Sequence, residues 1–344
     1  MDKSKISVII ACYNTADTLD RCFGSLLDQT YGFEHLQCIF IDDASTDDNA
    51  TWTKLQEFER RFPDNVIVIH CEENGRLGTA SNIGMKYADG KYLQFLDADD
   101  ELKPEAFEHL HSIAEQNRTD IIQYCHTLIL GDMRRVNPPC KTGLFEIKSK
   151  EDRVPFLDSS LVTYGRTNKF YNLDFVKRAN VRFAEKLVYE EPLFVYPLFL
   201  YAKRVLLSDE GYYLYYLHDN SIVTSLAGSN LLDHPNVQMQ VLYDCMKRKD
   251  VYEENRDVIS LYFLWSYYCE TVMFAGEYQD AVLPLEYFDL MQESCRRLFP
   301  DWRDNPLIQR VGKDIWDMLL SIDRRFGSQK ELNDYIMEIA HRHK

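Results

Sequence analysis

Four residues, Asp97-Ala98-Asp99-Asp100, follow an apolar run from Tyr92 to Leu96 that is typical of a buried β-strand. Because side chains alternate across a strand, we expect Asp97 and Asp99 to project to the same side and Ala98 to point away. Two carboxylates on one face repel each other unless a cation lies between them. Hard oxygen ligands favour Mg²⁺ or Mn²⁺, so this motif predicts a divalent metal site.

The acidic motif has two other interpretations, a solvated turn and a calcium-binding loop. The chain has 55 Asp and Glu against 39 Lys and Arg, a formal charge of -16, and acidic runs in such a chain are commonly solvated turns. The spacing of Asp97, Asp99, Glu101 and Glu108 also matches an EF-hand calcium loop. That loop needs glycine where this chain has Leu102, and a helix where it has a strand-like run. Catalytic metal ligation is therefore the favoured interpretation.

Strand and helix signals alternate through the first 126 residues, which indicates an α/β fold with a mostly parallel sheet flanked by helices. Strands are expected at 6–12, 36–41, 66–70, 92–96 and 121–126, and helices at about 15–27, 47–62, 78–88 and 104–116. Ligands of such sheets bind beyond the carboxyl ends of the strands. The polar residues at those ends, Tyr13, Asn14, Asp42, Asp43 and Asp97 to Asp100, therefore predict one cleft that can hold a cation, a pyrophosphate and a base.

Several other classes of protein are disfavoured. The turn after the first strand, Ala11 to Thr15, lacks the glycines of a dinucleotide-binding fingerprint, and the chain has no P-loop. The acidic composition argues against a nucleic-acid partner. Nine cysteines without paired spacing indicate reduced thiols rather than disulfides or zinc ligands.

Four motifs together resemble the family 2 glycosyltransferases. They are Val8 to Asn14, Ser25 to Tyr31, Ile41 to Asp47 and Phe95 to Asp100, in the order and spacing of that family. The resemblance covers residues 5–126 well and 160–225 more loosely. It implies the GT-A fold, a nucleotide diphosphate sugar as donor, usually a UDP sugar, and inversion at the anomeric carbon.

The resemblance also implies roles for individual residues. Tyr13 resembles the aromatic contact to the base, and Asp43 the carboxylate that accepts from the uracil imide. Asp97 matches the position facing the ribose and the metal, and Asp99 the direct ligand of Mn²⁺ or Mg²⁺, which would neutralise the departing diphosphate. The whole set expected to bind the donor is Ala11, Tyr13, Asn14, Asp43, Arg76, Asn82, Asp97, Ala98, His218 and Ser221, with Asp99 and Asp97 as metal ligands.

The chain departs from the family pattern at two of these places. Where the family often has Ala-Arg-Asn, the chain reads Ala80-Ser81-Asn82, and Arg76 is either a substitute phosphate contact or a surface arginine beside glycines. The usual arginine five residues before Ser221 is Tyr216. This leaves His218 as a candidate contact to the diphosphate, although a lone loop histidine is commonly a solvated bystander.

An inverting displacement needs a base that takes the proton of the attacking hydroxyl. Glu190-Glu191-Pro192 resembles the Glu-Asp pair of the family, whose second acid is the base and maps to Glu191. Two acids in the first turn of a helix also simply favour its dipole. Both interpretations are compatible, and we expect the helix N-terminus to make Glu191 more acidic. Upstream, Arg166 and Lys169 either meet an anionic acceptor or, as the favoured interpretation, pair with surface acids.

The expected domains are a GT-A catalytic domain at 1–225, with a nucleotide-sugar half at 1–126 and an acceptor half at 127–225, and a helical subdomain at 226–344. The helical part is interpreted as a packed cap. A homo-oligomer contact or a weak peripheral membrane contact stays open for it. No stretch is judged long enough to span a bilayer and no signal peptide precedes Ile6, so the cytoplasm, up to the inner face of the membrane, is the expected location.

The predicted function is metal-dependent sugar transfer from a nucleotide sugar to a hydroxyl of a glycan, a polyol phosphate or a lipid-linked acceptor, as in bacterial cell wall polysaccharide synthesis. One alternative is an inactive nucleotide-sugar or glycan-binding protein, which would keep Asp43 and Asp99 without needing Glu191. A nucleotidyltransferase is less favoured, because Ala16 to Leu19 has no Lys or Arg to hold a triphosphate.

Overall fold

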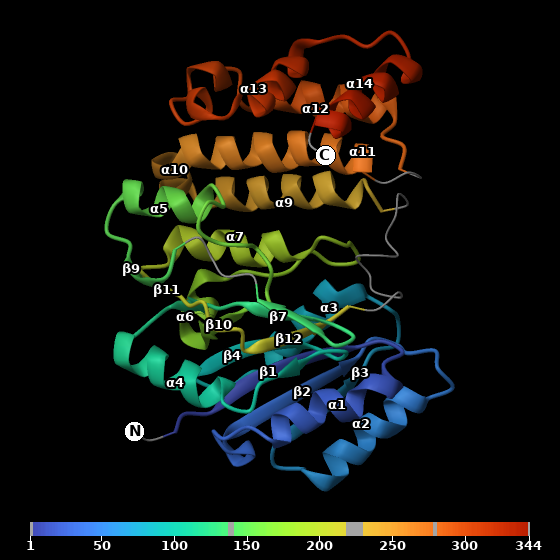
Figure 1. The fold of residues 1–344 in the computed structure, drawn as a ribbon, viewed down its shortest axis with the longest axis vertical. Coiled ribbons are helices and arrows are strands. Elements are labelled where there is room, and N and C mark those ends of the chain that lie inside the picture. Colours follow the sequence, from blue (N-terminus) through green and yellow to red (C-terminus); the bar gives the residue numbers. More distant parts are fainter. Residues whose placement is uncertain (1–2, 137–140, 218–229, 278–280, 343–344) are drawn as a thin grey trace. The chain divides into compact units, whose positions relative to one another are not determined.

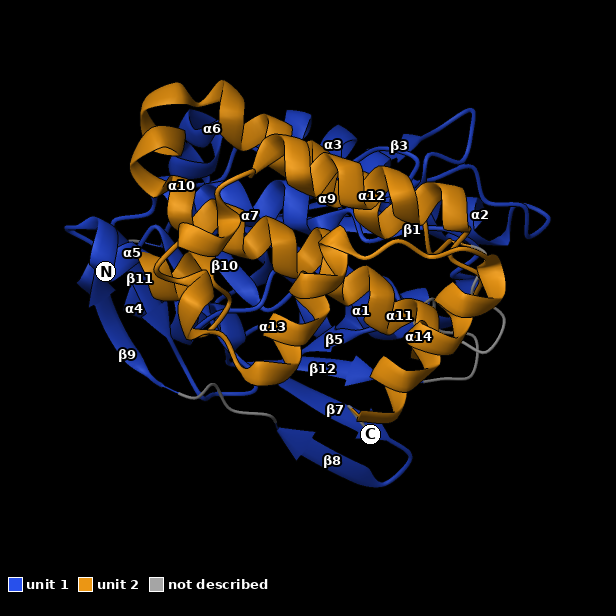
Figure 2. Ribbon diagram, turned by 90° about the horizontal axis from the view of Figure 1, so that it is seen from above, with its two compact units in different colours: residues 1–153, 161–218 blue, residues 154–160, 219–344 orange. Residues whose placement is uncertain are grey.

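A computed structural model describes residues 3–136, 141–217, 230–277 and 281–342. The chain divides into two compact units, which Figure 2 distinguishes by colour. Unit 1 comprises residues 1–153 and 161–218, and unit 2 comprises 154–160 and 219–344. The domain boundary expected at 225–226 lies outside the described residues.

Unit 1 is built on an eight-stranded sheet with the order β3-β2-β1-β4-β10-β6-β11-β9. The first four strands in this order are parallel, and only β10 and β9 run against the others. The mostly parallel sheet predicted from the sequence is confirmed. The strands are β1 (Ile6–Cys12), β2 (Leu36–Asp42), β3 (Val66–His70), β4 (Tyr92–Asp97), β6 (Ile121–Gln123), β9 (Gly143–Glu146), β10 (Lys169–Asn172) and β11 (Arg204–Leu207).

Helices cover both faces of this sheet, as Figure 1 shows. Alternate strand residues such as Val8 and Phe40 pack into one core cluster with Phe23 of α1 and Phe58 of α2. The opposite face meets α3 so closely that a Cβ on Gly84 would lie 2.6 Å from a methyl group of Ile9. The helices of unit 1 are α1 (Ala16–Leu27), α2 (Ala50–Arg61), α3 (Arg76–Tyr87), α4 (Ala106–Asn117), α6 (Leu173–Ala179) and α7 (Glu191–Tyr201), with a 3₁₀ turn, η1, at Phe33–His35.

A second, four-stranded sheet has the order β5-β12-β7-β8. It comprises β5 (Glu101–Leu102), β7 (His126–Leu130), β8 (Met133–Val136) and β12 (Tyr213–Tyr216). The expectation of a single strand at 121–126 is wrong, because β6 belongs to the large sheet whereas His126 begins β7 in the small one. The small sheet brings Tyr213 and Tyr216 to the acidic motif that follows β4.

The described part of unit 2 is helical. Its elements are α9 (Asp233–Lys247), α10 (Lys249–Phe263), the π-helical turns η2 (Leu264–Glu270), α11 (Thr271–Glu277), α12 (Leu285–Leu298), η3 (Trp302–Asp304), η4 (Ile308–Arg310), α13 (Lys313–Leu320), η5 (Ser321–Asp323) and α14 (Gln329–Arg342), while α5 (Lys150–Leu157) crosses the boundary of the units. The continuous helix Lys249–Glu277 is long and apolar enough to cross a membrane, contrary to the expectation that no stretch has this length. Since 72% of its apolar window is buried within the protein, a core helix explains the same composition.

Candidate active site

The loops after β1 and β2 are tied together at the carboxyl edge of the large sheet. The side-chain amide of Asn14 donates to Thr46 Oγ1 (3.2 Å), and its oxygen accepts from the Thr46 backbone N–H (2.7 Å). Asn14 has a positive φ of 54°, which turns the chain directly after the strand. Beside it the Tyr13 side chain is exposed, and Ala11 is half-buried in β1. An exposed aromatic ring on a fixed loop can stack on a planar ligand.

Asp43 holds the start of α3. Its carboxylate accepts the backbone N–H of Gly75 at 2.8 Å and also that of Arg76, the first helical residue, whose φ is 63°. Burial raises the pKa of Asp43 above its usual range. Asp43 and Arg76, which the sequence predicted separately, are thereby brought together through the backbone. The contact of Asp43 with a uracil stays a prediction.

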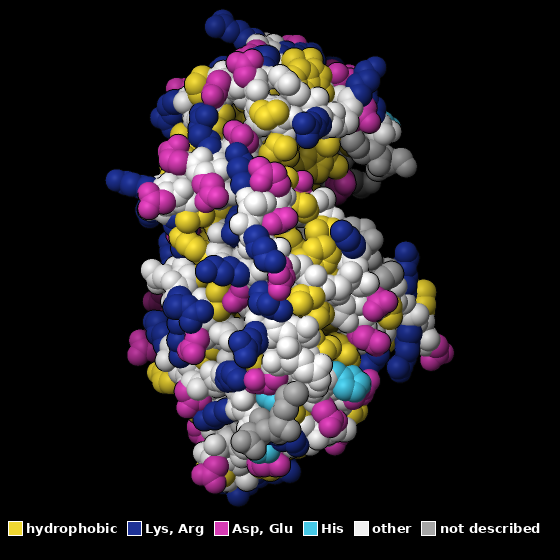
Figure 3. Space-filling model, turned by 90° about the vertical axis from the view of Figure 1, so that its left-hand side faces the viewer, with side chains coloured by type: hydrophobic (Ala, Val, Ile, Leu, Met, Phe, Trp, Pro, Cys, Tyr) yellow, Lys and Arg dark blue, Asp and Glu magenta, His cyan; other side chains and the backbone are white. Residues whose placement is uncertain are grey.

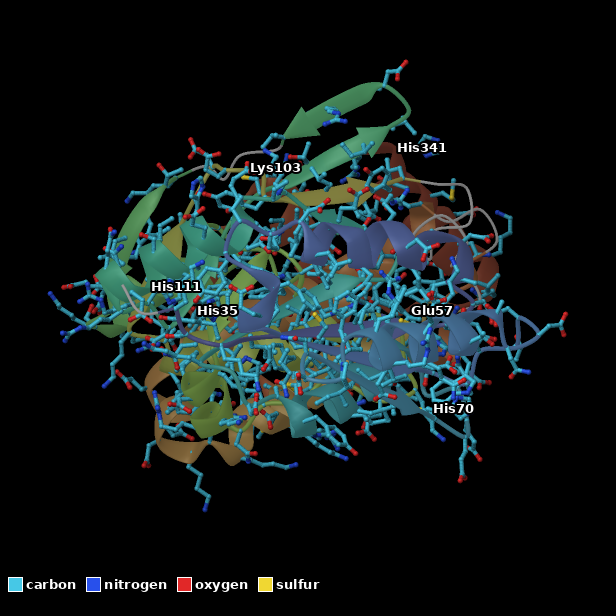
Figure 4. The ribbon with its side chains drawn as sticks, turned by 90° about the horizontal axis from the view of Figure 1, so that it is seen from below. His35, Glu57, His70, Lys103, His111 and His341 are labelled. Carbon is cyan, nitrogen blue, oxygen red and sulfur yellow. The ribbon has the colours of Figure 1, made fainter. Side chains whose placement is uncertain are left out.

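His70 is a neighbour of this edge that the sequence analysis missed. Its ring Nδ1 lies 2.7 Å from Asp42 Oδ2, and its ring packs 4.8 Å from that of Trp52. Asp42 is fully buried and also accepts the backbone N–H of Ser45. Figure 4 labels His70 at the end of β3. The sequence held part of the signal, because Asp42 directly follows the strand expected at 36–41 and His70 ends the strand expected at 66–70. The structure shows that the two residues pair in register.

The acidic motif forms the turn after β4. The strand ends at Asp97, and the Asp100 N–H closes the turn on the Asp97 carbonyl (3.1 Å), so strand alternation does not extend to Asp99 as expected. Asp97 and Asp99 are half-buried, whereas Ala98 and Asp100 are buried. Asp100 accepts from the hydroxyl of Tyr213 (2.7 Å) and the N–H of Tyr216 (2.9 Å). The fully buried Tyr213 thus fixes the turn, a role that the sequence analysis did not assign.

The donor set of this turn fits a hard divalent cation. Burial, followed by the charges of Asp97 and Asp99, raises the pKa of Asp100 to about 8. Such crowding of carboxylates is the repulsion that a cation relieves. Among the described residues no group of three or more His, Cys, Asp or Glu is arranged to enclose a metal. Two carboxylates with the remaining ligands from a phosphate and water is the usual arrangement for Mg²⁺.

The predicted base lies at the start of α7. Glu190 occupies the N-cap position without a capping hydrogen bond from its side chain and is buried. Glu191 is the first residue of the helix, with 32% of its side chain exposed. Burial raises the pKa of Glu191, against the lowering effect of Arg166. The expectation that the helix N-terminus makes Glu191 more acidic is therefore wrong, because loss of hydration outweighs the favourable charges around it. Burial also raises the pKa of Glu190, to about 7.

Arg166 and Lys169 do not pair with surface acids as expected, since both are fully buried. Arg166 forms an ion pair with Asp97, and its Nε lies 3.8 Å from Glu191 Oε1. Lys169 Nζ donates to the Gly165 carbonyl (2.6 Å), and burial lowers its pKa to about 7. The structure therefore brings the metal motif and the predicted base to one arginine.

The remaining predicted donor residues have different surroundings. Asn82 lies within α3, where its amide donates to the Phe183 carbonyl and to Glu185, both at 3.1 Å, and its oxygen accepts the Phe183 N–H (2.9 Å). These bonds support the segment before the predicted base, and a donor contact of Asn82 stays a prediction. His218 and Ser221 lie outside the described residues.

Comparisons with known proteins identify the family of the chain. The family model of Glycosyl transferase family 2 matches residues 7–178. The poly(ribitol-phosphate) beta-glucosyltransferase of Bacillus spizizenii is 28% identical over 214 residues, which are 61% of this chain and 32% of the relative. The cholesterol galactosyltransferase of Borreliella burgdorferi is 24% identical over 277 residues, 77% of this chain and 74% of the relative.

Solved structures show the same fold. The crystal structure of S. aureus TarS 1-349 in complex with UDP-GlcNAc has a TM-score of 0.74 at 19% sequence identity and covers 98% of this chain and 91% of that one. The chain spans only about a third of the length of the B. spizizenii relative (32%) and a quarter of the minor teichoic acid biosynthesis protein GgaB of Bacillus subtilis (25%). With the family model covering half of its residues and a GT-A fold, the chain belongs to glycosyl transferase family 2.

Proposed function

We propose that this protein is an inverting, metal-dependent glycosyltransferase that moves a sugar from a UDP sugar to an acceptor hydroxyl, with Glu191 as the base. One observation carries the proposal: Asp97 of the metal motif and Glu191 of α7 contact the same buried guanidinium, that of Arg166. A donor held at the metal motif would thus present its sugar toward Glu191. This is the arrangement that an in-line displacement with inversion requires.

On the donor side, Asp97 and Asp99 would hold Mn²⁺ or Mg²⁺, which supplies charge neutralisation for a departing diphosphate. Tyr13 offers an exposed ring for the base of the nucleotide, next to the loop that Asn14 holds. Asp43 and the N-terminus of α3 complete the same edge of the sheet. The metal, UDP and these residue roles are proposals supported by the family and by the placement of the side chains.

On the acceptor side, Glu191 would take the proton of the attacking hydroxyl. A raised pKa makes a carboxylate a stronger base, provided that it is ionised at the working pH. Relatives named for poly(ribitol-phosphate) and for cholesterol support an acceptor hydroxyl on a polyol phosphate polymer or on a lipid. Since nucleotide sugars are the substrates, we place the enzyme in the cytoplasm.

A screen of UDP and GDP sugars for release of nucleoside diphosphate, with a poly(ribitol phosphate) or a glycolipid precursor as acceptor and Mn²⁺ present, tests the proposal. We expect acceptor-dependent release with a UDP sugar. Glu191→Gln should abolish transfer and leave UDP affinity nearly unchanged, because the base does not hold the nucleotide. Glu210→Gln, at an exposed acid of the same unit, is the control that should keep full activity. Binding of UDP without turnover of any donor would contradict catalysis.

A further inference from the structure

Arg166 is a fully buried cation directly behind the predicted base. A buried guanidinium is stable only when acids or other acceptors surround it. Its Nη2 forms an ion pair with Asp97 Oδ1, and its guanidinium carbon, Cζ, lies 5.3 Å from the centre of the Phe95 ring. Its Nε and Nη1 have no hydrogen-bond partner in the described part of the chain. The side chain is thus held mainly by charge, between two carboxylates.

Arg166 contacts Glu191 in two ways. Its backbone N–H donates to Glu191 Oε1 at 2.9 Å, and its Nε lies 3.8 Å from the same oxygen. Both contacts use Oε1. The other oxygen, Oε2, lies 3.8 Å from where a Cβ of Gly165 would be. One carboxylate oxygen is therefore fixed by Arg166, and the second is on the side of Gly165.

The turn that presents Arg166 is itself fixed from inside. Lys169 Nζ donates to the Gly165 carbonyl (2.6 Å) and to Asn168 Oδ1 (3.0 Å). The Tyr171 hydroxyl donates to the Arg166 carbonyl (3.2 Å). Lys169 and Tyr171 belong to β10, which pairs with β4 of the metal motif. The arginine is thus anchored to the large sheet rather than to a loose loop.

We propose that Arg166 is a positioning residue that holds Glu191 with Oε2 toward the acceptor and links it to Asp97, so that the base and the donor site keep a set separation. The proposal rests on the proposed function and concerns a residue outside the four sequence motifs described above. A guanidinium suits this task because its three nitrogens can face two carboxylates at once, whereas an ammonium is a point charge. Arg166 touches no substrate in this role.

The first test does not need turnover. In protein labelled with ¹³C at the Glu carboxyl carbons, the signal of Glu191 is identified by its loss in Glu191→Gln and titrated by NMR. The groups that face it are Arg166, Lys169, Glu190 and Asp97. In Arg166→Met the pKa of Glu191 should rise by about 1–3, because a neighbouring positive charge favours the ionised carboxylate. An unchanged pKa in a folded variant would overturn the proposal.

Kinetics give the second test. In Arg166→Met the kcat for transfer should fall at least about tenfold and the acidic limb of the pH profile should move to higher pH, with UDP affinity changed less than about threefold. Arg166→Lys keeps the positive charge, so its kcat and the position of its acidic limb should lie between those of Arg166→Met and of the unaltered protein. If Arg166→Met does not fold, Arg166→Lys becomes the test. A kcat and a Glu191 pKa equal to those of the unaltered protein would then overturn the proposal.

Arg153→Met is the matched control. Arg153 donates to the carbonyls of Phe199 (2.6 Å) and Ala202 (3.1 Å) at the other end of α7. Its loss should lower thermal stability while the Glu191 pKa and the pH profile stay unchanged. If the unaltered protein shows no transfer at all, the proposed function fails, while the NMR titration still decides the role of Arg166.

Discussion

At the scale of single residues, the candidate site depends on carboxylates that are held close together. Asp97 is the last residue of β4, Asp99 and Asp100 follow it, and of these three only Asp100 is buried. Tyr213 and Tyr216 hold Asp100 in place. Contacts that the protein itself supplies to the turn reduce the conformational entropy that would be lost when a cation binds.

Asp99→Asn tests the metal ligand. The neutral amide is a weaker ligand than a carboxylate, so we expect Mn²⁺ to lose most of its effect on UDP affinity, by about tenfold or more. Calorimetric titration with UDP, with and without Mn²⁺, measures this. Asp64→Asn, at an exposed acid before β3, should keep the full metal effect. Equal Mn²⁺ dependence in the two variants would place the cation elsewhere.

Tyr213→Phe tests the support of the acidic turn. The hydroxyl donates to Asp100 in a buried contact and accepts the Asp97 N–H (3.1 Å) in a partly buried one. Removing it should lower the free energy of unfolding by about 1–3 kcal/mol, since the buried Asp100 carboxyl group loses a hydrogen-bond partner. Chemical denaturation measures this change. A variant as stable as the parent would show that the turn does not depend on Tyr213.

The site shows which contacts the sequence could predict. Residues at strand ends, such as Asp43 and Asp97, were placed on one edge because parallel strands share an edge. Arg166 was not, because the ion pair joins positions far apart in the chain and depends on how β10 pairs with β4. The predicted direction of the pKa shift of Glu191 was wrong for a similar reason. A helix N-terminus is visible in a sequence, whereas the extent of burial is not.

At the scale of elements, the apolar pattern was a reliable guide to the parallel strands β1 and β3, although only β1 is almost fully buried. The boundaries of β1 and β3 agree with the expected strands at 6–12 and 66–70. The stretch 121–126 is divided between two sheets, which its apolar pattern cannot show because that pattern does not specify the sheet that a residue joins. The chain leaves the large sheet after Gln123 and enters the small one at His126.

A glycine pair tests how closely α3 packs on the sheet. A Cβ on Gly84 would meet Ile9 at 2.6 Å and Ile41 at 2.9 Å, so Gly84→Ala should destabilise the protein by about 1–3 kcal/mol through overpacking. Gly24, within α1, has no atom within 4 Å of its Cβ position. Gly24→Ala should therefore stabilise by about 0.4–1 kcal/mol. Unfolding midpoints that move in the same direction would contradict the packing.

At the scale of the whole molecule, the net charge of -16 does not describe the candidate site. Acidic and basic side chains are interspersed over the face shown in Figure 3. Unit 1 instead gathers Asp97, Glu190 and Glu191 near the buried cations Arg166 and Lys169, and Arg166 is paired with both Asp97 and Glu191. Burial raises the pKa of each of these three acids, so the network has a pH dependence of its own.

Glu190 makes this dependence measurable. Its pKa rises from about 4.5 to about 7 on folding because the side chain is buried. The folded state therefore binds this proton more tightly than the unfolded state does. The free energy of unfolding falls as the pH rises from the unfolded-state pKa, about 4.5, to the folded-state pKa, about 7. Glu190→Gln cannot ionise, so it should match the parent near pH 4 and exceed it by up to roughly 3 kcal/mol at pH 8. Denaturant unfolding at both pH values measures the difference, with Glu210→Gln, an exposed acid, as the control expected to show none. A Glu190→Gln variant that is destabilised equally at both pH values would show that the carboxylate is needed for its hydrogen bonds rather than tolerated as a buried charge.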